Sequence, residues 1–382
     1  MSIHVILISQ EPLANGIPVV MEKPSLVVAV CTEMAITKKL DQKMAGFLEE
    51  IKIPIRLEKH APDANLSKVR IWAIDLLNRL EQDFSGEKIV LNLTGGNKIM
   101  SLGFWEAFKE RASRIIYTDT AHDCIEILSD KNLHHPPTLP MGQVLDVKTS
   151  LSIQGLEYIG DSSTNPQWRT TVDSRKSLTN YLASKAPVLK GLFSSLNAMA
   201  GQKSGTFSRS PSGEWKKALD YIVSSGLADW KSGSCEISFA NPDAAHYMGG
   251  GWLEEYAFLQ AKEAGFKDVR ANVKVRLETE MQVDNELDIV ICHRNRLFIL
   301  ECKTGRMNSN YDSKNDPTGI AYKSEILRQA VGGRFAETYL LLAQPPTQGL
   351  TNRAKDLSIT LVTPEELSNL RIIFKKILDR LK

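Results

Sequence analysis

Residues 285–303 constrain the fold more than any other stretch of the 382-residue chain. Two runs rich in Ile, Leu, Val and Phe flank a short polar segment, which is the pattern of an antiparallel hairpin. A turn centred on residues 294–295 places Asp288 opposite Glu301, and side-chain alternation brings Lys303 to the same face. Burying such charges on apolar strands without a partner is costly. The pattern therefore predicts a divalent metal bound by the two carboxylates.

The N-terminal part of the chain alternates short aliphatic runs with amphipathic segments. We expect strands over residues 3–8, 25–31, 53–57, 88–93, 114–117 and 124–128. Helical spacing is present over residues 32–51 and 66–83. Strand alternating with helix predicts an α/β domain with a mostly parallel sheet, whose ligands bind at the carboxyl ends of the strands.

A glycine pair lies at that edge of the predicted sheet. The sequence Thr-Gly-Gly-Asn-Lys at 94–98 leads from a strand into a helix expected over residues 99–111. Glycines let a ligand approach the backbone, and the helix start offers free N–H groups, so the loop suits an anion or phosphate. The alternative is a tight turn, because the Walker spacing is absent. Residues 9–15 and Thr32 follow two other strands at the same edge, although Thr32 also suits a helix N-cap.

This loop, on a sheet whose first strand ends in Ser9, Gln10 and Glu11, resembles the CARF domain of CRISPR ancillary proteins. That family binds cyclic oligoadenylates at the top of a dimer. The resemblance implies ligand contacts from Thr94, Gly95, Gly96 and Lys98, and from Ser9, Gln10, Glu11 and Asn15. Asn97 and Thr32, which lie at the same edge, complete the predicted ligand site.

The middle of the chain reads as a connector. Residues 162–167 are expected to be a loop, and residues 174–199 have helical composition interrupted by Pro187. Residues 201–213, rich in Gly, Ser and Lys, suggest a flexible segment. A helix over 214–225 followed by a ribbon over 228–239 resembles a winged helix. Because no basic recognition helix is present, a structural spacer is favoured over nucleic-acid contact.

The C-terminal part surrounds the hairpin with a particular order of elements. A helix from about residue 249 to 264 carries Glu254 near its start, and a strand over 269–277 precedes the hairpin. A helix over 325–336 and a strand over 338–342 follow it. Helix, hairpin with D…ExK, helix and strand resemble the PD-(D/E)xK restriction-endonuclease-like fold. The alternative without a catalytic role is a solvent-exposed hairpin face that carries an ion pair.

The nuclease resemblance implies a role for each polar residue. Hard Mg²⁺ or Mn²⁺ prefers carboxylate oxygen, so Asp288 and Glu301 are the expected metal ligands. Lys303 is expected to orient or deprotonate the attacking water and to stabilise charge on the phosphate. Further expected contributors are Glu254 through the metal or its water shell, the backbone carbonyl of Cys302 as a metal ligand, and Gln329 beside the lysine.

Composition adds few constraints. No apolar run approaches membrane-spanning length, and no signal peptide is recognisable, so we expect a cytoplasmic protein without membrane contact. Five cysteines without CxxC spacing argue against a zinc site and a disulfide framework. A net charge of +2 decides little about nucleic acid, because binding needs a local patch.

Taken together, the halves resemble the CARF and PD-(D/E)xK effector nucleases of type III CRISPR immunity. The expected domains are a CARF sensor at 1–140, a winged-helix-like connector at 141–245 and a nuclease domain at 246–382. The resemblance implies a homodimer that binds a cyclic oligoadenylate, with the tetra-adenylate as the expected ring, and then cleaves single-stranded DNA, RNA or nicked duplex. The alternatives are a ligand-gated DNA-binding regulator with an inactive nuclease fold, and a constitutive repair or restriction nuclease.

Overall fold

The computed structural model describes residues 2–277, 284–305 and 336–381. The described residues divide into two compact units, residues 2–157 with Leu277, and residues 158–276 with 284–305 and 336–381. Both contain a β-sheet with helices, which confirms the expected α/β class. Within the described ranges, no helix combines the length and the apolar character that a membrane crossing requires.

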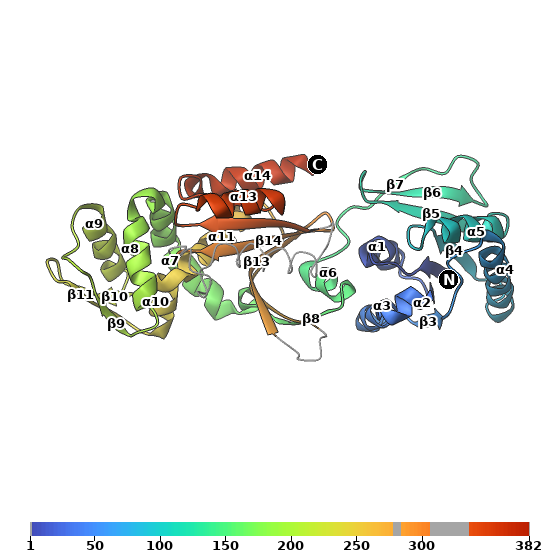
Figure 1. The fold of residues 1–382 in the computed structure, drawn as a ribbon, viewed down its shortest axis with the longest axis horizontal. Helices are drawn as coiled ribbons and strands as arrows, with labels where there is room; N and C mark the ends of the chain where they lie inside the picture. Colours follow the sequence, from blue (N-terminus) through green and yellow to red (C-terminus); the bar gives the residue numbers. More distant parts are fainter. Residues whose placement is uncertain (1, 278–283, 306–335, 382) are drawn as a thin grey trace. The chain divides into compact units, whose positions relative to one another are not determined.

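The first unit is built on a seven-stranded sheet in the order β3-β2-β1-β4-β5-β6-β7 (Figure 1). The strands are β1 Ser2–Leu7, β2 Leu26–Val30, β3 Ile55–Glu58, β4 Lys88–Asn92, β5 Arg114–Asp119, β6 Cys124–Asp130 and β7 Leu139–Pro140. Pairing is parallel from β3 to β5 and antiparallel for β6 and β7. This is the Rossmann-like arrangement that the alternating pattern predicts.

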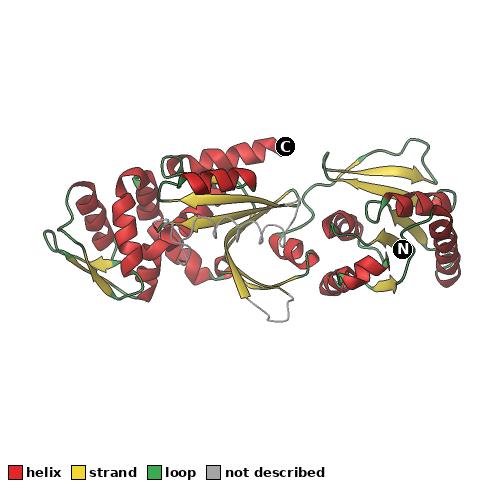
Figure 2. Cartoon of the chain, in the orientation of Figure 1, coloured by secondary structure: helices red, strands yellow, loops and turns green. Residues whose placement is uncertain are grey.

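Helices cover both faces of that sheet (Figure 2). They are α1 Pro12–Glu22, α2 Glu33–Thr37, α3 Leu40–Glu50, α4 Leu66–Asp83, α5 Lys98–Phe108 and α6 Val147–Ile153. On one face the buried side chains of β1, β2 and β4 form a hydrophobic core with those of α4 and α5. On the other, α1 and α3 pack with α6.

Two local predictions for this unit are wrong. The single helix expected over residues 32–51 is two helices, because Lys39 adopts a left-handed conformation with φ 56°. The turn expected over residues 9–15 ends earlier, because Pro12 opens α1 and proline is well tolerated in the first helical turn.

The second unit contains a six-stranded sheet in the order β16-β15-β14-β13-β12-β8. The strands are β8 Leu156–Gly160, β12 Asp268–Leu277, β13 Asp284–His293, β14 Arg296–Lys303, β15 Ala336–Leu342 and β16 Thr360–Val362. In the β13–β14 hairpin His293 pairs with Arg296 and Ile289 with Leu300. Both turn residues have positive φ, 48° at Arg294 and 62° at Asn295, as a two-residue type I′ turn requires. The predicted hairpin is confirmed, including its register.

The helices of this unit come from both the expected connector and the nuclease region. They are α7 Pro166–Ser184, α8 Ala186–Met199, α9 Gly213–Ser224, α10 Pro242–His246, α11 Trp252–Ala264, α13 Gln348–Asp356 and α14 Leu370–Arg380. Short 3₁₀ segments span Ser162–Thr164 and Leu367–Asn369, and a π turn spans Tyr247–Gly251. One hydrophobic core joins α7, α8 and α9 to α11 and the large sheet, so residues 158–245 pack with the C-terminal region that contains the hairpin.

Three sequence expectations for the connector need correction. The segment 201–213 contains strand β9, Ser204–Thr206, which joins β10, Ala228–Asp229, and β11, Glu236–Phe239, in a three-stranded ribbon. The expected loop 162–167 is a 3₁₀ turn followed by the start of α7. The helix break falls at Lys185 rather than Pro187, since Pro187 lies in the first turn of α8, where its missing N–H costs nothing.

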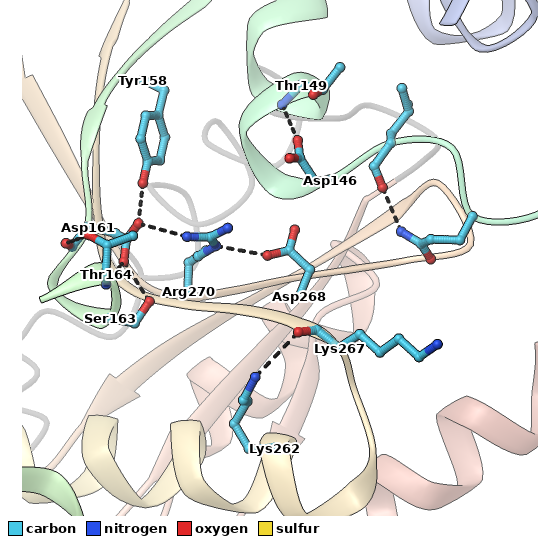
Figure 3. A network of polar contacts seen from close by, with 12 residues as sticks. Asp146, Thr149, Tyr158, Asp161, Ser163, Thr164, Lys262, Lys267, Asp268 and Arg270 are labelled. Atoms are coloured by element: carbon cyan, nitrogen blue, oxygen red, sulfur yellow. Dashed lines mark hydrogen bonds and ion pairs between the residues drawn. The ribbon is translucent and has the colours of Figure 1, made fainter. Parts of the chain in front are cut away.

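A polar network fixes the start of the second unit onto its sheet (Figure 3). Asp161, just after β8, accepts hydrogen bonds from Tyr158 and from the Thr164 backbone N–H, the latter at 2.8 Å. Arg270 of β12 donates to Asp268 at 2.8 Å and lies 3.5 Å from Asp161. The contacts hold β8 and α7 at the edge of the sheet.

Candidate functional site

The hairpin brings the predicted acidic residues together. Asp288 on β13 accepts a hydrogen bond at 2.7 Å from the backbone N–H of Cys302 on β14. Lys303 donates from Nζ to Oε1 of Glu301 at 2.6 Å, and Glu301 is only 6% exposed. The same-face placement inferred from the sequence is therefore present in the fold.

Electrostatics in this cluster follow from burial and like charge. Desolvation raises the pKa of Asp288 well above its usual range, and the neighbouring carboxylates of Glu301 and Glu254 raise it further. Burial by itself lowers the pKa of Lys303, but Glu301 and Asp288 outweigh that effect and the pKa rises. The lysine therefore remains an ammonium, because Glu301 and Asp288 favour its charged form.

Glu254 reaches the cluster from the first turn of α11. Burial raises its pKa, and a 2.7 Å hydrogen bond from Asn272 Nδ2 to its Oε2 opposes that shift. Asn272 has φ 52° inside β12, and it lies in register opposite Asp288, between the pairs Ala271–Ile289 and Val273–Leu287. A positive φ within a strand is uncommon, and asparagine tolerates it. Asn272 is not among the residues predicted from the sequence, although an amide inside an apolar strand is a usable signal.

A cavity of about 460 Å³ opens beside the cluster. Its lining comes from α8, α10, the π turn and the end of β14: Asn197, Ala200, Gly201, Pro242, His246, Gly249, Gly250, Gly251, Glu254, Cys302, Lys303, Thr304 and Gly305. His246 is a second residue not predicted from the sequence, and it interacts electrostatically with Glu254. Gly250 has φ 150°, a conformation that a side chain disfavours.

Helix α8 of the expected connector supports this cavity directly. Asn197 Nδ2 donates to the carbonyl of Gly249 and, at 3.2 Å, to Oγ1 of Thr304. Thr304 Oγ1 in turn donates to the Gly249 carbonyl at 3.3 Å. Gln344 Nε2 donates to the carbonyls of Thr304 at 3.1 Å and Lys190 at 2.7 Å. The strand end beyond Lys303 and the glycine turn ahead of Glu254 are thus bonded to the same helix.

A buried ion pair lies on the other side of α11. Arg175 donates to Oε1 of Glu255 at 3.1 Å, pairs with Asp243, and lies 4.7 Å from the ring centre of Tyr247. Burial raises the pKa of Glu255 to about 7, against the opposing effect of Arg175. This carboxyl therefore stays protonated over a wider pH range in the folded chain than in the unfolded one.

The raised pKa of Glu255 predicts a pH dependence of stability. The unfolded carboxyl releases its proton near 4.5 and the folded one near 7, so stability falls as pH rises between those values. The fall is on the order of 2 kcal/mol. Changing Glu255→Gln should flatten it, as measured by urea unfolding from pH 5 to 8. The half-buried Glu337→Gln should keep the wild-type slope, and a slope unchanged in Glu255→Gln contradicts the assignment.

The donor types of the cluster fit a hard divalent cation. Three carboxylates and the Cys302 carbonyl are oxygen donors, and the mutual repulsion of the carboxylates is what a cation relieves. Among the residues that the structure describes, no group of three His, Cys, Asp or Glu side chains is arranged to hold a metal ion. Lys303 engages Glu301, and the Cys302 N–H engages Asp288. Gln329 lies outside the described residues.

The predicted ligand loops of the first unit lie at its switch point. β1 is flanked by β2 on one side and β4 on the other, so the loops after β1 and β4 diverge at the carboxyl edge. A Cβ on Gly95 would lie 1.7 Å from the carbonyl oxygen of Leu7, so only glycine permits this approach. Asn15 Nδ2 donates to the same carbonyl at 2.8 Å, and Asn15 is fully buried. Asn15 therefore fixes the end of β1 at the place where the Gly95 loop packs against it.

Other predicted ligand residues divide into caps and exposed groups. Thr32 caps α2 through the Ala35 N–H at 3.3 Å, and Asn97 caps α5 through the Met100 N–H at 3.0 Å. The Glu11 N–H donates to Ser9 Oγ at 3.4 Å, which shapes the turn after β1. The exposed members of the predicted set are Gln10, Glu11, Gly96, Asn97 and Lys98.

Thr94 joins the loop to the sheet beneath it. Its Oγ1 donates to Asn92 Oδ1 at 2.5 Å and accepts from the Thr118 N–H at 2.7 Å. Thr94→Val leaves the Thr118 N–H without this acceptor and should lower the free energy of unfolding by about 1–3 kcal/mol. Urea unfolding measures the loss. Thr94→Ser keeps the hydroxyl and should retain most of the stability, and equal losses in both variants contradict the role of the hydroxyl.

Comparison with known proteins assigns both parts of the chain. Residues 3–149 match the family model of the Card1 CARF domain, and residues 241–380 match that of the Card1-like endonuclease domain. The chain belongs to the Card1 family. A CARF domain thus contains the glycine loop of this Card1-family chain, and an endonuclease domain contains its acidic cluster. No curated protein matches the chain.

Solved structures share the fold of this Card1-family chain. Protein VC1899 from Vibrio cholerae is 23% identical, with a TM-score of 0.84 over 99% of this chain and 98% of that one. Can2 from Sulfobacillus thermosulfidooxidans, in complex with cyclic tetra-adenylate, is 23% identical, with a TM-score of 0.75 over 98% and 97%. A type III CRISPR defence DNA nuclease activated by cyclic oligoadenylate is 14% identical, with a TM-score of 0.52 over 89% of this chain and 45% of that chain.

Proposed function

We propose that the chain is a metal-dependent endonuclease of type III CRISPR antiviral defence, activated by a cyclic oligoadenylate, with cyclic tetra-adenylate as the first candidate. The observation that carries the proposal is the convergence of Glu254, Asp288, Glu301 and Lys303 in a cluster beside one cavity of a domain of endonuclease family. An Asp288 carboxyl whose pKa is raised by burial and by the neighbouring Glu301 and Glu254 carboxylates, beside the Lys303 ammonium, suits metal-assisted phosphodiester hydrolysis.

Each residue of the cluster has a role in that reaction. Asp288, Glu301 and the Cys302 carbonyl would hold Mn²⁺ or Mg²⁺, and Glu254 would add a carboxylate from α11. When bound, the metal supplies Lewis acidity to the phosphate and lowers the pKa of water. The Lys303 ammonium orients the attacking water and stabilises charge that develops on the phosphate. The position of Gln329 beside Lys303 remains a prediction.

The proposed activator binds the CARF domain at the loops after β1 and β4. Can2, which shares the fold, was solved with cyclic tetra-adenylate, and this supports the choice of ligand. Gln10, Glu11, Gly96, Asn97 and Lys98 are the exposed groups that would contact it. The ligand acts on a homodimer by binding the active arrangement more tightly than the resting one. A cytoplasmic location and the boundaries 1–140, 141–245 and 246–382 remain predictions.

A cleavage assay tests the proposed chemistry. Purified protein is incubated with cyclic tetra-adenylate, Mn²⁺ or Mg²⁺, and labelled single-stranded DNA, RNA or nicked duplex. The proposal predicts shortened products that disappear when the metal is removed by a chelator. Cleavage that continues at the full rate in the presence of the chelator contradicts it. So does the absence of products from all of these substrates, with cyclic tetra-adenylate and with cyclic oligoadenylates of other ring sizes.

A further inference from the structure

A second hollow adjoins the catalytic cavity and has a different character. It measures about 430 Å³ and shares Ala200, Gly201 and Pro242 with the catalytic cavity. Its other walls include Phe239, Ala240 and Lys203, and the Phe239 N–H donates to the Lys203 carbonyl at 3.0 Å. The two spaces therefore lie next to each other, with Lys303 lining one and Lys203 lining the other.

The chemistry of this hollow is mixed. Ala240 and Pro242 supply exposed apolar carbon, Phe239 lines the wall although it is only 7% exposed, and Lys203 supplies a positive charge at the same wall. An apolar wall beside a cation suits a planar base whose backbone phosphate lies next to it. A base held in a duplex is stacked and paired, so only an unpaired base can enter such a space.

The neighbouring ribbon surface differs in charge. A hollow of about 630 Å³ over β9, β10 and β11 also includes Gln202, and its lining carries the carboxylates of Asp229 and Glu236. Lys231 is its one lysine among the described lining residues. Two carboxylates and one lysine disfavour a phosphate backbone in the ribbon hollow. The hollow lined by Lys203 has no carboxylate in the part of its lining that the structure describes, so its charge suits a phosphate better.

We propose that the hollow of Phe239, Ala240, Pro242 and Lys203 holds an unpaired nucleobase of the substrate strand, next to the phosphate in the catalytic cavity. The inference rests on the proposed function and adds a base-binding subsite to it. Lys203 contacts the adjoining phosphate, and the apolar wall contacts the base face. The ribbon thereby contributes to substrate binding through its edge, without a recognition helix.

Binding without metal tests the subsite apart from cleavage. Fluorescence anisotropy compares a labelled thymidine oligonucleotide with an abasic strand of equal length. Wild type should bind the thymidine strand about tenfold more tightly, the contribution of one stacked base. Ala240→Glu, at an exposed position in the hollow, should remove that preference. Ser204→Glu adds the same charge in the ribbon hollow and should keep it.

The anisotropy measurements decide whether the hollow binds a nucleobase. Equal affinity of wild type for the two strands, or an undiminished base preference in Ala240→Glu, overturns it. Loss of the preference in Ala240→Glu alone supports it, provided that both variants bind the abasic strand equally. A wild-type chain that binds with this base preference but cleaves nothing contradicts the proposed function and still supports the subsite.

Discussion

Changing Glu301→Gln should lower nucleic-acid cleavage by about 10²- to 10⁴-fold. Glu301 is 6% exposed and accepts the Lys303 ammonium at 2.6 Å. A neutral amide keeps the shape of the side chain but removes the charge that pairs with Lys303 and that would hold the proposed cation. The measurement is the initial rate on labelled single-stranded DNA and RNA with Mn²⁺ and activator.

Two controls separate this chemical effect from a structural one. Glu337→Gln alters a carboxylate on the adjacent strand β15 that pairs with Arg380 at the surface, and it should cleave like wild type. Binding of cyclic tetra-adenylate to Glu301→Gln, measured by calorimetry, should be unchanged. Full cleavage by Glu301→Gln contradicts the assigned role. A wild-type chain that binds activator and DNA but never cleaves supports the ligand-gated regulator instead.

Changing Gly95→Ala should weaken binding of the cyclic oligoadenylate by about 100-fold. The new Cβ would lie 1.7 Å from the backbone oxygen of Leu7 and 2.8 Å from Asn15 Nδ2, so the loop after β4 must move. Displacement of the loop also misplaces Gly96 and Lys98, which follow directly. Calorimetric titration with cyclic tetra-adenylate gives the dissociation constant.

A second glycine provides the matched control for this variant. Gly46 lies in α3, and a Cβ there meets nothing within 4 Å. Gly46→Ala should leave ligand affinity unchanged and raise stability by about 0.5–1 kcal/mol. Wild-type affinity in Gly95→Ala shows that the loop after β4 is not part of the ligand site.

Local sequence signals predicted the hairpin and much of the first sheet. The register of Asp288 and Glu301 follows from a two-residue turn, and a turn is a local property of Arg294 and Asn295. Helix α4 has the predicted bounds, because its apolar stripe is regular over its full length. The glycine loop could also be placed, since it follows a strand and precedes a helix.

Contacts between distant segments could not be predicted in this way. Asn272 joins the cluster through a positive φ that one residue in a strand does not reveal. His246 lies in the short helix α10, and the glycine turn between α10 and α11 brings it to the same cavity as Glu254. Asn197 bonds to Gly249 and Thr304 across more than fifty residues of sequence. Such contacts depend on packing of the connector helices against the nuclease sheet, which has no periodic signature.

The ratio of cleavage rates with and without cyclic tetra-adenylate tests the central claim most directly. If the ligand shifts the dimer from a resting to an active arrangement, the ratio in Mn²⁺ should reach about 100. The purified full chain, freed of bound nucleotide, is assayed on labelled single-stranded DNA and RNA. We expect the enzyme to be nearly silent until the cyclic nucleotide is added. Equal rates with and without any cyclic oligoadenylate contradict it and identify a constitutive nuclease.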